Sequence, residues 1–137
     1  MCLRSLEPPS FEKADMIYTE LLSITSDQQS LFEAGEFYIV WSSSLKLKKE
    51  EDFMKNVEKR VRYKDLAKRG SDLLERISLY RDQHKYHFLL AHAYFNLWEN
   101  ERALRCMDKA IELADGDVDC SKQYMKFRKV IIRQRNF

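Results

Sequence analysis

The fold is decided by residues 84–115, which read HKYHFLLAHAYFNLWENERALRCMDKAIELAD. Apolar and small side chains recur here at helical spacing, first at Leu89, Leu90, Ala93 and Leu97, then at Ala103, Leu104, Met107, Ala110, Ile111 and Ala114. The polar pair Glu99-Asn100 separates the two stripes and predicts a turn. Two apolar stripes joined by a short turn predict a hairpin of antiparallel helices.

The residues after this hairpin predict a terminal helix over 118–135. Gly116 stands where a residue in the left-handed conformation commonly ends a helix, and Asp117 can cap the next helix. Tyr124, Phe127 and Ile131 then supply an apolar face at helical spacing.

Residues 10–82 predict further, more divergent hairpins. Ser10 and Asp27 are expected to cap the first two helices, because both precede apolar stripes. A long stripe over 53–80 predicts a single helix, which Gly70 could interrupt.

The composition fits one domain over residues 1–137. A hydrophobic share of 45% can form a core without disulfides or metals, and three Gly with two Pro are fewer than a strand-rich fold requires. No alternating strand pattern is present. We therefore predict an all-α fold of about six antiparallel helices, stacked as a short solenoid or bundle.

The cysteines and the apolar runs indicate a compartment. Cys2, Cys106 and Cys120 show no paired spacing, which argues against a disulfide framework or a zinc site and favours a reducing environment. The longest apolar run, 37–41, is too short to span a membrane, and the first residues do not resemble a secretory signal. We expect a cytoplasmic protein and leave a nuclear location open.

The chain lacks the motifs of catalysis and cofactor binding. His84, His87 and His92 have no Cys or acidic ligand at a convincing distance in sequence, so no metal is expected. Residues 115–126 fail as a calcium loop, because Cys120 and Lys126 stand where Gly and Glu are needed. No phosphate-binding loop or nucleophile motif occurs. We expect no cofactor and no enzymatic activity.

Charge is unevenly distributed along the chain. Residues 1–45 hold two basic and seven acidic side chains, whereas 46–69 hold ten basic and five acidic ones. The basic helices over 53–69 and 118–135 leave RNA or other nucleic-acid binding open as an alternative function. The opposite charges of the first two segments could also drive self-association, or could neutralise each other within one chain.

The hairpin over 84–115 resembles one tetratricopeptide repeat. This family alternates small and large residues at fixed places in a pair of helices. Leu90-Ala91 stands at the large-small pair of the first helix, followed by the aromatic Tyr94. Ala103 and Ala110 match the small residues of the second helix, whereas His87 and Asp115 depart from the pattern. The resemblance implies a stack of helix pairs, and an ordinary six-helix domain with one repeat-like hairpin remains the alternative.

The resemblance also implies a function. The first helix of each pair lines a concave groove that holds partner peptides, so this chain would be a non-enzymatic adaptor or scaffold. The groove-facing, partner-binding set would be Lys85, Phe88, His92, Phe95, Asn96, Lys122, Lys126 and Lys129. Such a surface is basic with an aromatic floor and suits an acidic protein or peptide bound in a groove or at an end face.

Plainer interpretations of these residues stay open. The three lysines fall on one helical face, which is often only a solvated face. Phe88 and Phe95 are equally compatible with a core position. Leu89 stands where family members that clamp chaperone tails have an arginine, so we do not expect that clamp.

Overall fold

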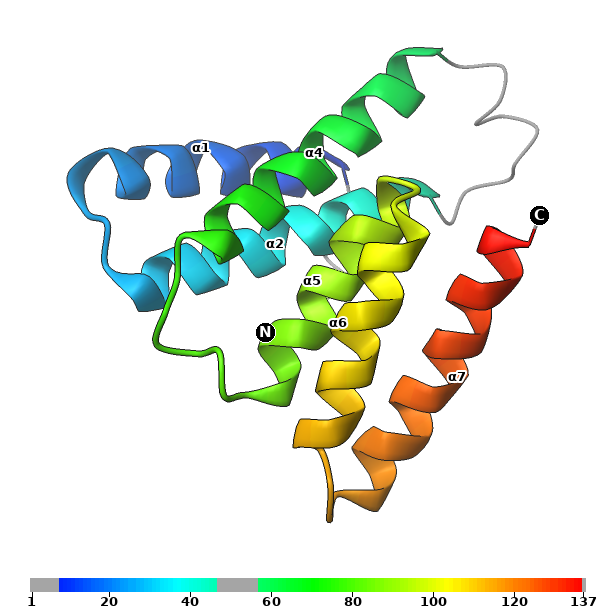
Figure 1. The fold of residues 1–137 in the computed structure, drawn as a ribbon. Helices are drawn as coiled ribbons and strands as arrows, with labels where there is room; N and C mark the ends of the chain where they lie inside the picture. Colours follow the sequence, from blue (N-terminus) through cyan, green and yellow to red (C-terminus); the bar gives the residue numbers. More distant parts are fainter. Residues whose placement is uncertain (1–7, 47–56, 137) are drawn as a thin grey trace.

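The computed structural model describes residues 8–46 and 57–136, with the side chains of 11–45 and 61–136. These residues form helices and no strand, which confirms the all-α prediction. The helices are α1 (Pro8–Ile24), α2 (Gln28–Lys46), α4 (Val57–Glu75), α5 (His84–Asn96), α6 (Asn100–Leu113) and α7 (Val118–Arg135) (Figure 1). In the described part of the chain, no helix has the length and apolar character needed to cross a membrane.

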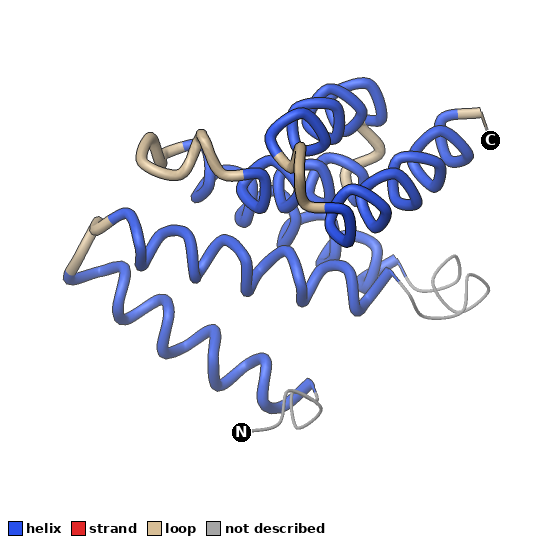
Figure 2. The backbone as a smooth tube through the Cα atoms, turned by 90° about the horizontal axis from the view of Figure 1, so that it is seen from below, coloured by secondary structure: helices blue, strands red, loops and turns tan. Residues whose placement is uncertain are grey.

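Two helix pairs pack side by side. α2 packs mainly on α4 and α5 mainly on α6, and both α2 and α4 contact α5. α7 continues the row by packing on α6 (Figures 1 and 2). α1 lies beside α2, but its backbone comes close to the α2 backbone at few places. The expected helices over 84–115 and 118–135 therefore form, and they stand at one end of the molecule.

Close packing between α2 and α4 depends on two glycines. A Cβ atom on Gly70 would lie 2.5 Å from Ile39 Cγ1 and 3.0 Å from the carbonyl oxygen of Gly35. A Cβ atom on Gly35 would lie 2.9 Å from Leu74 Cδ2. The two backbones therefore cross where neither helix has a side chain. Gly70 interrupts nothing, because α4 runs through it without a break.

The predicted helix over 53–80 ends at Glu75, earlier than its apolar stripe suggests. Gln28 Oε1 accepts hydrogen bonds from the backbone N–H groups of Ser78 and Leu79, at 2.9 and 2.8 Å, and so stabilises a turn after the helix. Ile77 nevertheless is buried in the core. The stripe persists past Glu75 because residues of the turn are also buried. Residues 53–56, where the stripe begins, lie outside the described part.

The helix ends test the predicted caps. Asp27 accepts hydrogen bonds from the N–H groups of Gln29 and Ser30, as expected of a cap. Ser10 is not a cap: α1 begins at Pro8 and includes Ser10, since proline suits the first helical turn.

The end of α5 was not foreseen. Trp98 has φ 63°, the left-handed conformation that usually belongs to glycine. Glu99 N–H donates to the Tyr94 carbonyl at 2.9 Å and Trp98 N–H to the Phe95 carbonyl at 3.1 Å, which is the Schellman pattern. The sequence did not predict this helix end, because the usual signal is a glycine and this chain has a tryptophan there.

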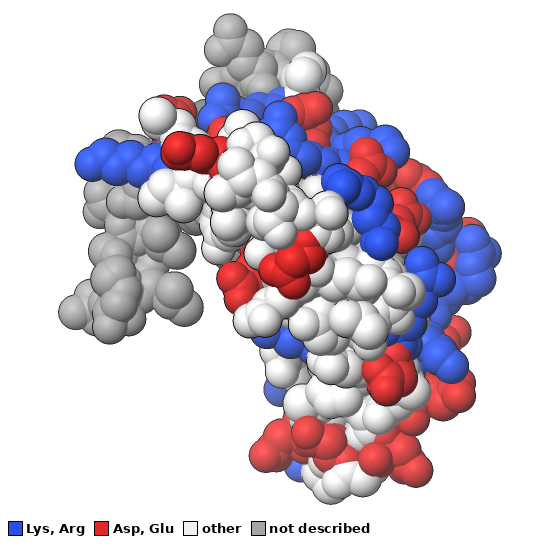
Figure 3. Space-filling view, turned by 90° about the vertical axis from the view of Figure 1, so that its left-hand side faces the viewer, with Lys and Arg blue, Asp and Glu red and all other residues white. Residues whose placement is uncertain are grey.

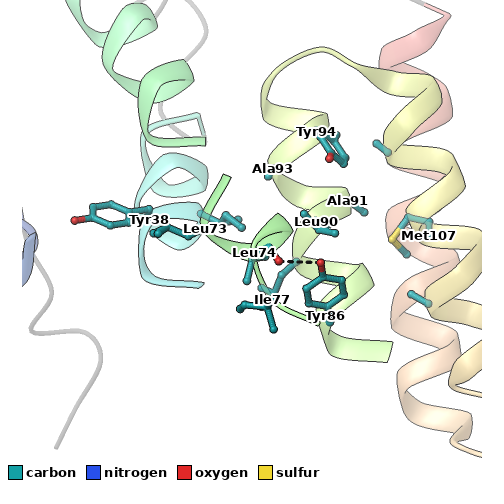
Figure 4. Close-up of a cluster of buried hydrophobic side chains, with 14 of the residues drawn as sticks. Tyr38, Leu73, Leu74, Ile77, Tyr86, Leu90, Ala91, Ala93, Tyr94 and Met107 are labelled. Atoms are coloured by element: carbon teal, nitrogen blue, oxygen red, sulfur yellow. Dashed lines mark hydrogen bonds between the residues drawn. The ribbon is translucent and has the colours of Figure 1, made fainter. Parts of the chain in front are cut away.

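The core joins α4 to the α5–α6 hairpin. Tyr86 of α5 is buried and donates its hydroxyl to the Leu74 carbonyl of α4 at 2.8 Å (Figure 4). Met107 of α6 is fully buried, as are the small residues Ala91 and Ala103 that let α5 and α6 approach closely. The small-large alternation over 84–115 thus packs as predicted.

Opposite charges from the first two segments meet within the chain. Arg62 of α4 lies 3.5 Å from Glu12 of α1, and Arg69 lies 3.5 Å from Asp15. Both guanidinium groups also lie over aromatic rings, those of Trp41 and Tyr38. Exposed ion pairs of this kind contribute little to stability. They do, however, leave less unpaired charge on this surface for contacts with other molecules.

Candidate partner-binding surface on the terminal helix

The start of α7 is fixed by the turn before it. Gly116 has φ 94°, the predicted left-handed conformation. The Asp117 carboxylate accepts a hydrogen bond from Cys120 N–H at 3.1 Å and caps the helix, as predicted. That bond holds the pKa of Asp117 below its ordinary value.

The rotation of α7 is set by its aromatic face. Tyr124 and Ile131 are buried, and Phe127 is half-buried against the core. Phe88 of α5 stacks on Tyr124 with ring centroids 4.5 Å apart. The side of α7 opposite Tyr124 therefore faces away from α5 and out of the molecule.

That outward side carries the three predicted lysines. Lys122, Lys126 and Lys129 line a shallow depression of about 530 Å³ together with the turn between α6 and α7. Val118 and Met125 also line it, and they are 64% and 50% exposed. The three lysine residues thus border apolar side chains that are open to solvent.

The charge of this surface is largely uncompensated by its neighbours. Among the ion pairs of the described residues, none involves Lys122, Lys126 or Lys129. Arg128, which lies on another face of α7, instead forms an ion pair with Asp108 of α6 at 2.8 Å. Among the described residues that line the depression, Asp115 alone is acidic, and it lies in the turn before α7.

The aromatic residues of α5 serve a different purpose. Phe95 packs against Phe127 of α7 with ring centroids 5.3 Å apart, and His92 stacks on Phe127 at 3.9 Å. With Phe88 on Tyr124, these half-buried side chains hold α5 against α7. Phe88 and Phe95 therefore occupy packed positions between α5 and α7.

The remaining predicted residues of α5 face α2. Lys85 forms an ion pair with Glu36 at 3.1 Å. Asn96 is only 1% exposed and donates to the Ser42 and Ser43 hydroxyls at 3.2 and 3.0 Å. A buried amide with these partners stabilises the α2–α5 contact and is not open to a partner here. The structure thus splits the eight predicted residues into the lysine face of α7 and the two contact surfaces of α5.

The basic residues of α4 present a mixed surface. Lys and Arg side chains gather along the right-hand side of the molecule in Figure 3, with acidic side chains between them. This side of the molecule faces the reader in Figure 1. Lys68 pairs with Asp72 at 2.8 Å, and Arg69 pairs with Asp65 as well as Asp15. The side chains of Lys55, Lys59 and Arg60, which the nucleic-acid alternative also uses, lie outside the described set.

The Cys106 thiol is unsuited to nucleophilic chemistry. Burial raises its pKa to about 11. It therefore stays protonated at neutral pH, and a thiol, unlike a thiolate, is a poor nucleophile.

The sequence was compared with protein-family models, curated proteins and solved structures, and none of them matches this chain. The tetratricopeptide resemblance therefore stays a prediction that rests on residues 84–115.

Proposed function

We propose that this chain is a protein-interaction module whose terminal helix α7 binds an acidic segment of a partner protein. The observation that carries the proposal is the depression in which Lys122, Lys126 and Lys129 border Val118 and Met125. Three ammonium groups on one face attract carboxylates, and the exposed apolar side chains offer area that a partner can bury. The bound segment would carry acidic residues beside one or two apolar side chains.

The end position of α7 supports this role. α6 packs on its inner side and aromatic rings of α5 contact it there, whereas Lys122, Lys126 and Lys129 are exposed. An adaptor that binds at its end face can hold a partner without rearranging its core. The internal pairing of Arg62, Lys68 and Arg69 favours this protein-binding role over nucleic-acid binding through α4.

The test is selection from a displayed library of short peptides, followed by fluorescence polarisation with the selected sequences. We expect enrichment of peptides that combine Asp or Glu with apolar residues. The triple variant Lys122→Glu, Lys126→Glu, Lys129→Glu should weaken binding at least ~30-fold, since each lost charge contact at a rim costs about 0.5–1 kcal/mol and reversal adds repulsion.

A matched control separates local from overall charge. Lys13→Glu, Lys64→Glu and Arg105→Glu change the net charge equally and alter exposed residues elsewhere. This variant should bind within about threefold of the wild type in physiological salt, because distant charges are screened. Equal losses in both variants, or enrichment of neutral peptides, would contradict the proposal.

A further inference from the structure

The turn before α7 brings two neighbouring side chains next to a histidine that is distant in the sequence. His84 begins α5, while Asp117 and Cys120 belong to the cap and first turn of α7. One ligand atom from each, a ring nitrogen, a carboxylate oxygen and the Sγ atom, lies within 4.8 Å of the other two. Sequence spacing alone gave no reason to pair His84 with a cysteine.

The geometry is close to what a tetrahedral ion requires. With bonds of about 2.0–2.3 Å to nitrogen, oxygen and sulfur, neighbouring ligand atoms of a zinc ion are separated by about 3.3–3.7 Å. Small side-chain rotations of exposed Asp117 and half-buried Cys120 would close the difference. His84 is itself held in place, because its Nδ1 atom lies 2.6 Å from the Tyr124 hydroxyl and its ring packs edge-on against Tyr124.

The chemistry of the three groups is also selective. A thiolate with an imidazole suits zinc and related borderline ions, whereas calcium and magnesium prefer oxygen ligands alone. One thiolate and one carboxylate balance the two charges of the ion. This balance offsets the partial positive charge of the helix starts at α5 and α7, which otherwise opposes a cation.

We propose that His84, Asp117 and Cys120 form a binding site for a divalent ion of the zinc class. Three protein ligands leave one coordination position for water or for a group supplied from outside. Because the ligands come from the starts of α5 and α7, the ion would tie the terminal helix to the hairpin before it. This inference stands independently of the proposed peptide binding.

Calorimetric titration of the reduced, chelator-treated full chain with zinc chloride tests the site. We expect one zinc ion per chain and at least a ~10-fold loss of affinity in Cys120→Ser and in His84→Gln, a lower bound taken from the cost of disturbing even indirect metal partners. Matched controls are Cys106→Ser, Cys2→Ser and His87→Gln, which should keep the wild-type affinity within about twofold. Circular dichroism in chelator establishes that each variant is folded.

Cobalt substitution gives a second, independent result. Cobalt(II) bound to a thiolate has a sulfur-to-metal charge-transfer band, so the band should appear in the wild type and in Cys106→Ser and vanish in Cys120→Ser. The proposal is overturned if the wild type binds no zinc, if affinity is unchanged in Cys120→Ser and His84→Gln, or if the cobalt complex lacks the thiolate band. The cluster would then be a helix cap and a histidine–tyrosine contact only.

Discussion

The α5–α6 hairpin and the α1–α2 pair are both antiparallel helices, yet they are held together differently. Between α5 and α6, small residues such as Ala91 and Ala103 are fully buried and the backbones lie close. Between α1 and α2, large rings keep the backbones apart, as where Phe11 stacks on Trp41 at 5.4 Å. Close backbone packing leaves little room for repacking, so the two regions should differ in stability and in tolerance of substitution.

The exposed surface of α1 reflects the same difference. Met16, Ile17 and Ile24 stay largely in solvent, whereas the apolar residues of α6 are mostly buried. Local opening has a low free energy where few apolar contacts are lost. The following variants test this contrast, beginning with the largest expected effect.

Met107→Ala should destabilise the protein most. Met107 is fully buried between the tightly packed helices, and removing such a side chain costs about 3 kcal/mol through lost contacts and the cavity left behind. Urea unfolding followed by circular dichroism measures the loss. The exposed Met16→Ala is the matched control and should change stability by less than about 0.5 kcal/mol. Similar losses of unfolding free energy in both variants would contradict the difference between the two regions.

Gly70→Ala should cost about 2 kcal/mol by overpacking the crossing of α2 and α4. The added Cβ atom would lie 2.5 Å from Ile39 Cγ1, so Ile39→Ala should relieve part of the strain. A double-mutant cycle by urea unfolding, with both single variants as references, measures this coupling. Strictly additive losses would show that the crossing is looser than described.

Asp27→Ala should give a smaller, pH-dependent loss. The Ser30 hydroxyl and the Gln29 N–H donate to the carboxylate and lower the pKa of Asp27. A group with a lowered pKa stabilises the fold above its unfolded pKa, and this stabilisation is lost as pH falls through the folded pKa. The difference in Tm between wild type and variant should therefore be largest near neutral pH and shrink in acid. The control is Asp82→Ala, which removes an exposed turn carboxylate and should lower Tm less than Asp27→Ala does at neutral pH.

Arg69→Gln should have the smallest effect on global stability, below about 1 kcal/mol, because the pairs it makes are partly exposed. Its effect should instead be local. Without the contacts of Arg69 to Asp15 and over the Tyr38 ring, the amides of α1 should exchange faster with deuterium. Amides of α6 are the internal reference, and equal acceleration in both helices would contradict a loosely attached α1.

Local sequence signals predicted most of the fold. Apolar periodicity located the helices, and Asp27, Gly116 and Asp117 marked real helix boundaries because caps depend on neighbouring backbone alone. The end of α4 at Glu75 was not predicted, since it depends on the tertiary contact of Gln28 with the turn. The positive φ of Trp98 was not predicted because a bulky residue rarely takes that conformation.

The candidate site was predictable only in part. Helical spacing placed Lys122, Lys126 and Lys129 on one face, which the structure retains. The rotation of α5 relative to α2 and α7 decided that Lys85 and Asn96 face α2, and no spacing rule contains that rotation. The apolar border of the depression, Val118 and Met125, was missed because isolated apolar residues on a polar face carry no periodic signal.

Amine footprinting of a complex with a library-selected peptide tests the proposed binding surface most directly. Lysine acetylation, read by mass spectrometry with and without the peptide, reports which ammonium groups become covered. Binding at the end face predicts protection of Lys122, Lys126 and Lys129, with Lys64, Lys85 and Lys109 unchanged. Protection of Lys85 without protection of the α7 lysines would contradict this account and place the partner over α5 and α2.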